Sequence, residues 1–553
     1  MKGNSHVSSV VVTAVVLVAL ALSSGVAAGQ TYHTSSKKAV RLYKKATNKI
    51  QKKNYEDALR FVDRSIDCDG KFIEALQRKA NIGIAVGDDD MAIEYYERSL
   101  AVDSMAFPLN AIKLSDLYDK KGEYSKAVRV LTWYCSLKNV KDDQMRVARR
   151  LLENAVFREA AVKNPVDFHP VNLGENVNTD GDEYINQILP DGSKIYFTRR
   201  LVEKDADGFR IEGVYYSTIV DNQCLPSVPM NLNWNNKKRM GAVNISPDQK
   251  KMYFVGIDWL DSNGRGDVYV SEYEGGTWGK PQNLGKVVNT PTVESQPCVD
   301  ADGKRLYFTR YSRVNETTDL YVSDWFDGKW NNPRAINNVN TKGNEMSPFI
   351  HPDGKTLYFV SDGLPGMGGY DVFMCKRNDK GEWGQPVNLG YPLNTPDDEI
   401  SFAVSADGKT GYISSVREGG FGGFDIYSFE LGQDNSPEEI EPQRFVLHDI
   451  KFKLNSAVLD SSSFSVIDSV ASYLLANPMV KVEILGFTDN SGDERHNAEL
   501  SLQRANSVKE ALASRGISGD RMSATGYGEN RPLVPNDTEK HKALNRRVEI
   551  RYY

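Results

Sequence analysis

A helical pattern of apolar and polar positions repeats through the first part of the chain. Three polar segments each lead into an alanine, at Ala58, Ala92 and Ala127, and these positions lie 34 and 35 residues apart. After Ala92 the apolar residues recur at helical spacing, so one face of the predicted helix is apolar. A period near 34 residues is typical of paired helices that stack on their neighbours. We therefore predict an all-α helical repeat array over residues 36–162.

Short strands replace the helices over residues 168–430. A turn dipeptide recurs there, with Asp248-Gln249 in the second of five places, at intervals of 57, 54, 51 and 54 residues. The other four copies are Asp191-Gly192, Asp302-Gly303, Asp353-Gly354 and Asp407-Gly408. Each copy precedes a run of β-forming residues, and glycine accepts the positive φ that a tight hairpin needs. Five such units predict an all-β propeller of about five blades.

The last part of the chain mixes both patterns. Residues 431–443 are polar and acidic with two prolines, which indicates a linker. Beyond it we predict strands at 445–453, 480–487, 521–527 and 546–552. Helices are predicted at 462–476 and 496–514. This order predicts an α/β sandwich over residues 444–553 with helices on one face of a small sheet.

The first residues have the pattern of an export signal. Val10–Leu22 is apolar except for Thr13, which suits the core of a signal peptide but is short for a membrane-spanning helix. Small residues follow, so we predict a signal peptide over residues 1–29, with cleavage before Gln30. A retained membrane anchor is the alternative. We expect no transmembrane span in the mature protein.

Composition narrows the classes of function. The net charge of −6 argues against a nucleic-acid-binding protein. Five cysteines lie far apart, so they form neither a metal motif nor a complete disulfide framework. No zinc-protease, nucleotide-binding or serine-hydrolase motif is present. The acidic loop at residues 258–267 lacks the spacing of a calcium-binding loop. We therefore expect no catalytic residue, no metal and no cofactor.

An ordered set of polar residues in the last 105 or so positions carries the sharpest functional signal. It comprises Thr488-Asp489, Asn497, Leu500-Ser501, Arg504-Ala505 and Asn545-Arg546-Arg547. The set resembles the OmpA-like C-terminal domain, a peptidoglycan-binding module. The resemblance implies that Asp489 and Arg504 hold the diaminopimelate end of a peptidoglycan stem peptide. Phe487 departs from the family, which commonly has histidine there.

The charges suit that ligand. Diaminopimelate carries an ammonium and a carboxylate on one carbon, so an anion and a cation at fixed separation would recognise it. Arginine binds a carboxylate through two parallel hydrogen bonds. The remaining predicted site residues are Thr488, Asn497, which we expect to cap the helix, Leu500, and Asn545 and Arg547 at the rim. We expect Arg546 to face away. A simple surface ion pair between Asp489 and Arg504 is the competing interpretation.

Two further resemblances complete the domain assignment. Residues 36–162 resemble tetratricopeptide repeats, and residues 168–430 resemble the WD-like, Tol-B-like propeller repeats of periplasmic proteins. The order of the three parts is similar to the peptidoglycan-anchoring component of type IX secretion, although that component has a carboxypeptidase-regulatory-like domain that finds no room here. A paralogue or a general OmpA-family envelope protein fits nearly as well.

These features together favour a non-catalytic scaffold in the periplasm, associated with the outer membrane and peptidoglycan. Its expected partners are the peptidoglycan stem peptide and outer-membrane or secretion-machinery proteins. The competing class is an enzyme, a propeller hydrolase targeted to the cell wall. That class requires carboxylates that converge from several blades and have perturbed pKa values. A motor stator is a weaker alternative, because Val10–Leu22 contains no buried carboxylate.

Overall fold

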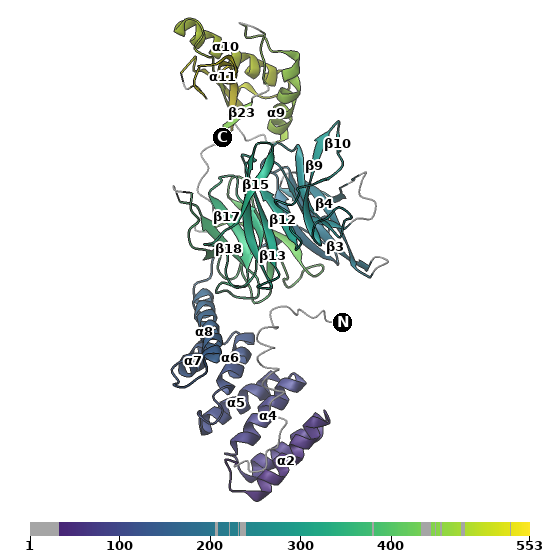
Figure 1. The fold of residues 1–553 in the computed structure, drawn as a ribbon, viewed down its shortest axis with the longest axis vertical. Coiled ribbons are helices and arrows are strands. Elements are labelled where there is room, and N and C mark those ends of the chain that lie inside the picture. Colours follow the sequence, from purple (N-terminus) through teal and green to yellow (C-terminus); the bar gives the residue numbers. More distant parts are fainter. Residues whose placement is uncertain are drawn as a thin grey trace.

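The protein is described here by a computed structural model. It describes residues 32–204, 208–220, 222–230, 232, 239–378, 381–432, 444–447, 450–453, 456–476, 482–530, 532 and 534–552. The predicted signal peptide and nearly all of the predicted linker lie outside the described residues. Figure 1 shows a helical part followed by a strand-rich part and a mixed C-terminal part.

The predicted helical array is confirmed. Its helices are α2 (Lys37–Gln51), α3 (Tyr55–Cys68), α4 (Ile73–Val86), α5 (Asp89–Val102), α6 (Asn110–Lys120), α7 (Tyr124–Cys135) and α8 (Asp142–Lys163). The three repeated alanines are fully or almost fully buried, as close helix packing requires. Ser36, Asn54 and Asp88 accept a hydrogen bond from the backbone of α2, α3 and α5 and so fix where these helices begin. None of the described helices combines the length and apolarity needed to cross a membrane.

The strand-rich part consists of five antiparallel sheets. The first contains β2 (Asp182–Ile188), β3 (Lys194–Lys204), β4 (Arg210–Val220), β5 (Gln223–Cys224) and β6 (Val228–Pro229), and the second contains β7 (Met240–Ile245), β8 (Lys251–Ile257), β9 (Gly266–Glu274), β10 (Thr277–Trp278) and β11 (Gln282–Asn283). The third contains β12 (Glu294–Val299), β13 (Arg305–Ser312), β14 (Thr317–Phe326) and β15 (Lys329–Ala335), and the fourth contains β16 (Glu345–Ile350), β17 (Thr356–Ser361), β18 (Asp371–Lys376) and β19 (Val387–Asn388). The fifth joins β1 (Val171–Asn172) to β20 (Glu399–Val404), β21 (Thr410–Ser415) and β22 (Asp425–Glu430).

The repeated turns have the backbone conformation that the sequence predicts. The glycines of the four Asp-Gly turns have φ between +66° and +71°, and Gln249 has φ +56° in the remaining turn. In four sheets the turn joins the first two strands, and in the fifth it joins β20 to β21. The dipeptide therefore specifies a local hairpin, because a left-handed residue in the turn matches the twist of the two flanking strands.

The predicted assembly of these hairpins into a closed propeller is wrong. Among the described strands of residues 168–430, hydrogen-bonded ladders run within each sheet and none joins two sheets, so these strands form separate open sheets and no closed barrel or propeller. The strands β2, β7, β12, β16 and β20 of neighbouring sheets lie close to one another, and so do β2 and β20. The physical reason for the error is that an Asp-Gly turn determines strand pairing nearby and carries no information on how finished sheets assemble.

In four of the sheets a buried glutamate lies at or near the start of the strand that precedes the repeated turn. Glu183, Glu294, Glu345 and Glu399 are fully buried, and each accepts hydrogen bonds from a threonine four residues earlier. Arginine lies 2.8 Å from the carboxylate of Glu183 and of Glu294. Burial raises the pKa of Glu294, although Thr290 and Arg310 oppose that shift. Each glutamate therefore connects the loop that precedes its strand to the sheet.

We expect Arg310→Ala to destabilise the strand-rich part strongly. Removing Arg310 leaves the carboxylate of Glu294 buried without its cation, a change that typically costs about 3–5 kcal/mol. Thermal unfolding of the full chain, followed by near-ultraviolet circular dichroism, measures the effect. Arg98→Ala is the matched control, because Arg98 and Glu94 form an exposed pair whose loss should cost about 0.5 kcal/mol or less. Equal effects of the two substitutions would contradict the assigned role of Glu294.

The last helix of the array contacts the fourth sheet. Arg158 donates a hydrogen bond of 2.8 Å from its Nε to the carbonyl of Gly366, and Arg150 donates one of the same length to the carbonyl of Asp362. Both carbonyls belong to the loop between β17 and β18. The helical and strand-rich parts are therefore connected by two arginine side chains that donate hydrogen bonds to backbone carbonyls.

The C-terminal part is an α/β unit, as predicted. Its elements are β23 (Arg444–Leu447), α9 (Phe464–Ala476), β24 (Val482–Gly486), α10 (Glu494–Ala513), β25 (Met522–Gly526), α11 (Glu539–Asn545) and β26 (Val548–Tyr552). The sheet order is β23-β26-β24-β25, and only β24 and β25 run parallel. Of the strand predicted at 445–453, residues 448–449 lie outside the described residues and β23 accounts for the part up to Leu447, whereas α11 has no counterpart among the predicted elements.

Candidate functional site

The predicted site begins where β24 ends. Gly486 closes the strand, and Asp489 follows three residues later in a loop. Asn497, on α10, donates a hydrogen bond of 3.3 Å from its side-chain amide to the Asp489 carbonyl and another of 2.7 Å to Glu529. Asn497 therefore orders the loop but does not cap the helix. The cap is Asp493, whose carboxylate accepts a hydrogen bond from the backbone of His496.

Two glycines bring α10 close to the sheet. A Cβ atom at Gly486 would overlap the carbonyl oxygen of Ser501, and one at Gly526 would lie 2.5 Å from the Leu502 nitrogen. The Ser501 hydroxyl donates to the Ala498 carbonyl and accepts a hydrogen bond of 2.8 Å from the Gly528 nitrogen. The backbone of α10 thus sits directly on the two parallel strands, which fixes the helix relative to the loop of Asp489.

Asp489 is a buried carboxylate that already has a partner. One oxygen accepts a hydrogen bond of 2.7 Å from the Ser491 nitrogen, and the other forms an ion pair with Arg546. The Asp489 side chain is 7% exposed, whereas that of Arg546 is 39% exposed. Burial alone would raise the pKa of Asp489, but the hydrogen bonds from Arg546 and Ser491 outweigh it and hold the pKa below its ordinary value.

Arg504 is a buried cation on the adjacent helix. Its Nε donates a hydrogen bond of 3.2 Å to the Ser456 carbonyl, and its guanidinium carbon lies 5.1 Å from the centre of the Phe452 ring. Among the described residues, no carboxylate lies within 4.0 Å of it. Burial, and next the charge of Arg546, lower the pKa of Arg504, while Asp489 raises it. The structure therefore places one carboxylate and two guanidinium groups near one another, and Asp489 pairs with Arg546 rather than with Arg504.

The remaining predicted site residues occupy different positions. Thr488 is buried beside Asp489, and its hydroxyl has no hydrogen-bond partner among the described residues. Leu500 is partly buried on α10. Asn545 is fully buried, and its amide bonds to the backbone of Val534 in both directions. Asn545 therefore holds a neighbouring loop in place.

The adjacent residues Arg546 and Arg547 lie in two different environments. Arg547 is buried, pairs with Glu549 at 2.7 Å and has its guanidinium 3.9 Å from the centre of the Phe487 ring. Phe487, the residue that departs from the family, is itself buried and stacks on Tyr527. The expectation that Arg546 faces away is wrong, because it meets Asp489. Neighbouring residues of an extended segment point to opposite sides, so the sequence shows that one arginine faces the site but not which one.

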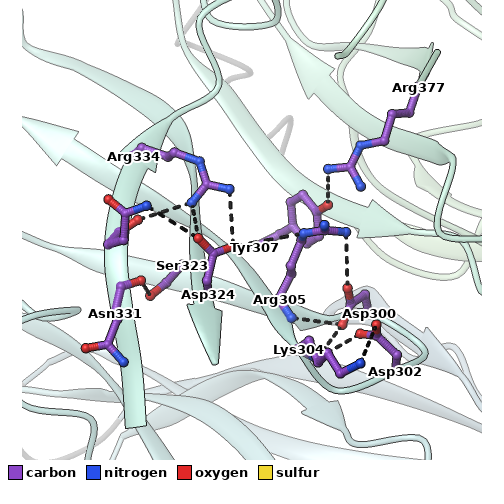
Figure 2. Close-up of polar contacts among 11 residues, drawn as sticks. Asp300, Asp302, Lys304, Arg305, Tyr307, Ser323, Asp324, Asn331, Arg334 and Arg377 are labelled. Atoms are coloured by element: carbon purple, nitrogen blue, oxygen red, sulfur yellow. Dashed lines mark hydrogen bonds and ion pairs between the residues drawn. The ribbon is translucent and has the colours of Figure 1, made fainter. Parts of the chain in front are cut away.

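The competing hydrolase interpretation depends on perturbed carboxylates in the strand-rich part. Asp300 is such a group: burial, with Asp302 beside it, raises its pKa to about 6. Figure 2 shows that Asp300 and Asp302 share one hairpin turn, where the backbone nitrogens of Lys304 and Arg305 each donate to Asp300 at 2.9 Å. Asp300 and Asp302 therefore come from one turn of one sheet, whereas the hydrolase interpretation requires carboxylates that converge from several blades. Among the described residues, no group of three or more His, Cys, Asp or Glu side chains is arranged to hold a metal ion.

Comparison with known proteins identifies the C-terminal part. Residues 451–546 match the OmpA family, so this part is an OmpA family domain. Outer membrane porin F of Pseudomonas fluorescens is 39% identical over 101 residues, which cover 18% of this chain and 31% of that protein. Peptidoglycan-binding protein ArfA of Mycobacterium tuberculosis is 41% identical over 101 residues, with the same coverage of 18% and 31%. The chain spans between about a third and about half of the length of the curated relatives it matches, at 31% to 55%.

A solved structure is similar to about a fifth of the chain. The crystal structure of the peptidoglycan-associated lipoprotein from Burkholderia pseudomallei shares 27% identity and covers 22% of this chain and 98% of that one. The TM-score between the two is 0.18.

We expect Gly486→Ala to destabilise the C-terminal domain, because the added Cβ meets the backbone of α10 and no side chain can move to relieve the overlap. Overpacking of this kind typically costs about 1–3 kcal/mol. Gly519→Ala is the matched control, since nothing lies within 4 Å of a Cβ there. Urea unfolding of the two variants measures the difference. Similar midpoints would show that α10 and β24 are less tightly packed than described.

Proposed function

We propose that this protein is a non-catalytic anchor that holds an envelope assembly to peptidoglycan through its C-terminal domain. The observation that carries the proposal is the juxtaposition of Asp489, Arg504 and Arg546 within an OmpA family domain. The names of its relatives, an outer membrane porin and a peptidoglycan-binding protein, support a position in the periplasm near the outer membrane. The proposed ligand is the diaminopimelate end of the stem peptide.

The chemistry of the site suits a ligand with both charges. Asp489 would accept the ligand ammonium, and Arg504 would donate to its carboxylate through two parallel hydrogen bonds. Arg546 stands at the Asp489 carboxylate where that ammonium would bind, so its more exposed side chain must move or share the carboxylate. Thr488, Asn497 and Leu500 shape the site, whereas Asn545 and Arg547 position it from within the fold.

The rest of the chain would bind the proteins of the assembly that is anchored. We propose that the helical array and the five sheets bind outer-membrane or secretion-machinery proteins. Support comes from their exposed repetitive surfaces, because stacked helical repeats usually present extended faces to partner proteins. Arg150 and Arg158 would transmit load from the array to the sheets.

We expect Asp489→Ala and Arg504→Ala each to weaken peptidoglycan binding about tenfold to a hundredfold, because each removes a charge-assisted hydrogen bond of about 1.5–3 kcal/mol. Arg504→Lys should also weaken it, since lysine lacks the paired donors. The measurement is sedimentation of the mature chain with purified sacculi. Arg495→Ala is the control on the same helix, because the Arg495 side chain is 88% exposed, and it should pellet like wild type. Pelleting of both alanine variants at the wild-type level would refute the site.

Binding should also persist in mild acid. Because the pKa of Asp489 lies below its ordinary value, the carboxylate stays ionised as the pH falls from 7 to about 5. The Asp489–Arg546 pair likewise contributes stability above the unfolded aspartate pKa of about 3.9 and loses it as the pH falls through the lower folded value. Titration of the mature chain with a diaminopimelate-containing muropeptide tests this. A loss of affinity between pH 7 and 5 that Asp489→Asn abolishes would contradict the assignment.

A further inference from the structure

The helix α2 carries positive charge along the whole of its outer side. Eight lysines and arginines lie between residues 37 and 53, and the chain contains no Asp or Glu before Glu56. The eight are Lys37, Lys38, Arg41, Lys44, Lys45, Lys49, Lys52 and Lys53. At 3.6 residues per turn, the six that belong to α2 fall within an arc of about 140°, which we call the basic face. The buried residues of the helix occupy its remaining side, and they are Ala39, Leu42, Tyr43 and Ala46.

The basic face is not neutralised within the protein. Lys49 pairs with Asp57, but in the part of the chain that the structure describes no carboxylate lies within 4.0 Å of the other seven cations. All seven are exposed. Because residues 1–36 contain no acid, the segment before the helix cannot supply one either. A dense set of like charges on one helix repels itself and attracts anions from outside the protein.

The composition of the basic face differs from that of a protein interface. Interfaces between proteins are depleted in lysine and are centred on aromatic or apolar anchors. Five of the six cations on α2 are lysines, and none of the large hydrophobic side chains of this helix is exposed. A layer of anionic lipid headgroups needs only positive charge near its surface. The basic face therefore suits an anionic membrane surface better than the surface of a protein.

The position of α2 in the molecule is compatible with a membrane surface. Figure 1 shows α2 at one end of the long axis and the C-terminal domain at the other end. A bilayer that contacts α2 would therefore leave the C-terminal domain free to bind peptidoglycan.

We propose that the basic face of α2 binds the anionic phosphate headgroups of a phospholipid bilayer. The attraction acts over about one Debye length, so the contact is sensitive to salt. No apolar side chain of α2 is available to enter the bilayer, so the contact is electrostatic and reversible. This surface lies in the helical array and is separate from the proposed peptidoglycan site.

The test measures co-sedimentation of the mature chain with phosphatidylcholine vesicles that contain about 30% phosphatidylglycerol, and with neutral vesicles of phosphatidylcholine alone. Binding to the neutral vesicles should be at least tenfold weaker. Binding to the anionic vesicles should fall at least tenfold as the salt concentration rises from about 0.05 to 0.5 M. The triple substitution Lys37→Gln, Lys38→Gln and Arg41→Gln should weaken it about a hundredfold, since each cation contributes about fivefold.

A second triple variant is the matched control, because it removes the same charge elsewhere. Its substitutions are Arg265→Gln, Lys304→Gln and Arg495→Gln, at side chains that are more than two-thirds exposed, and it should bind vesicles like wild type. Both variants should keep the circular dichroism spectrum of wild type. The α2 variant should still sediment with sacculi, and Asp489→Ala should still bind vesicles, which separates this surface from the proposed function.

Three results would overturn the proposal. One is equal binding to neutral and anionic vesicles, and another is an equal loss of binding in the two triple variants. The third is release of the chain from anionic vesicles by soluble polyglutamate at an equal concentration of charge, because the basic face would then belong to an acidic protein partner.

Discussion

The close approach of α10 to the parallel strands β24 and β25 is the contact on which the candidate site depends. Glycine at positions 486 and 526 allows the helix backbone to rest on the strands, and Ser501 fastens it there. Asp489 belongs to the loop after one of these strands and Arg504 to the helix. Any side chain at the two glycines would therefore move the anionic half of the site relative to the cationic half.

The same domain contains two buried carboxylates, Glu549 and Asp489, whose arginine partners differ in exposure. Arg547 and Glu549 neutralise each other inside the fold, so neither is available to a ligand. Asp489 is equally buried, but its partner, Arg546, is the most exposed member of the group. Arg546 also lies 3.9 Å from the exposed carboxylate of Glu539, so the cation that pairs with Asp489 is shared between a buried and an exposed acid.

Charge balance also distinguishes the two larger parts of the chain. In the strand-rich part, buried glutamates meet threonine and arginine partners from the same sheet and serve as fastenings. In the helical array, by contrast, ion pairs such as Lys49 with Asp57 and Lys121 with Asp90 join exposed or partly exposed side chains. The ion pairs of Glu183 and Glu294 thus lie inside the sheets, whereas those of the array lie near its surface.

The sequence by itself determined every feature that depends on local spacing. The helical period, the Asp-Gly turns with their positive φ, and the order of strands and helices in the C-terminal domain all follow from residues near one another, and so does the presence of Asp489 and Arg504 in one domain. Only the tertiary structure decided that the five sheets stay open, that Asp493 rather than Asn497 caps α10, and that Arg546 faces Asp489 while Arg547 turns inward. These outcomes depend on which distant elements pack together, and packing depends on the combined shape and charge of several segments.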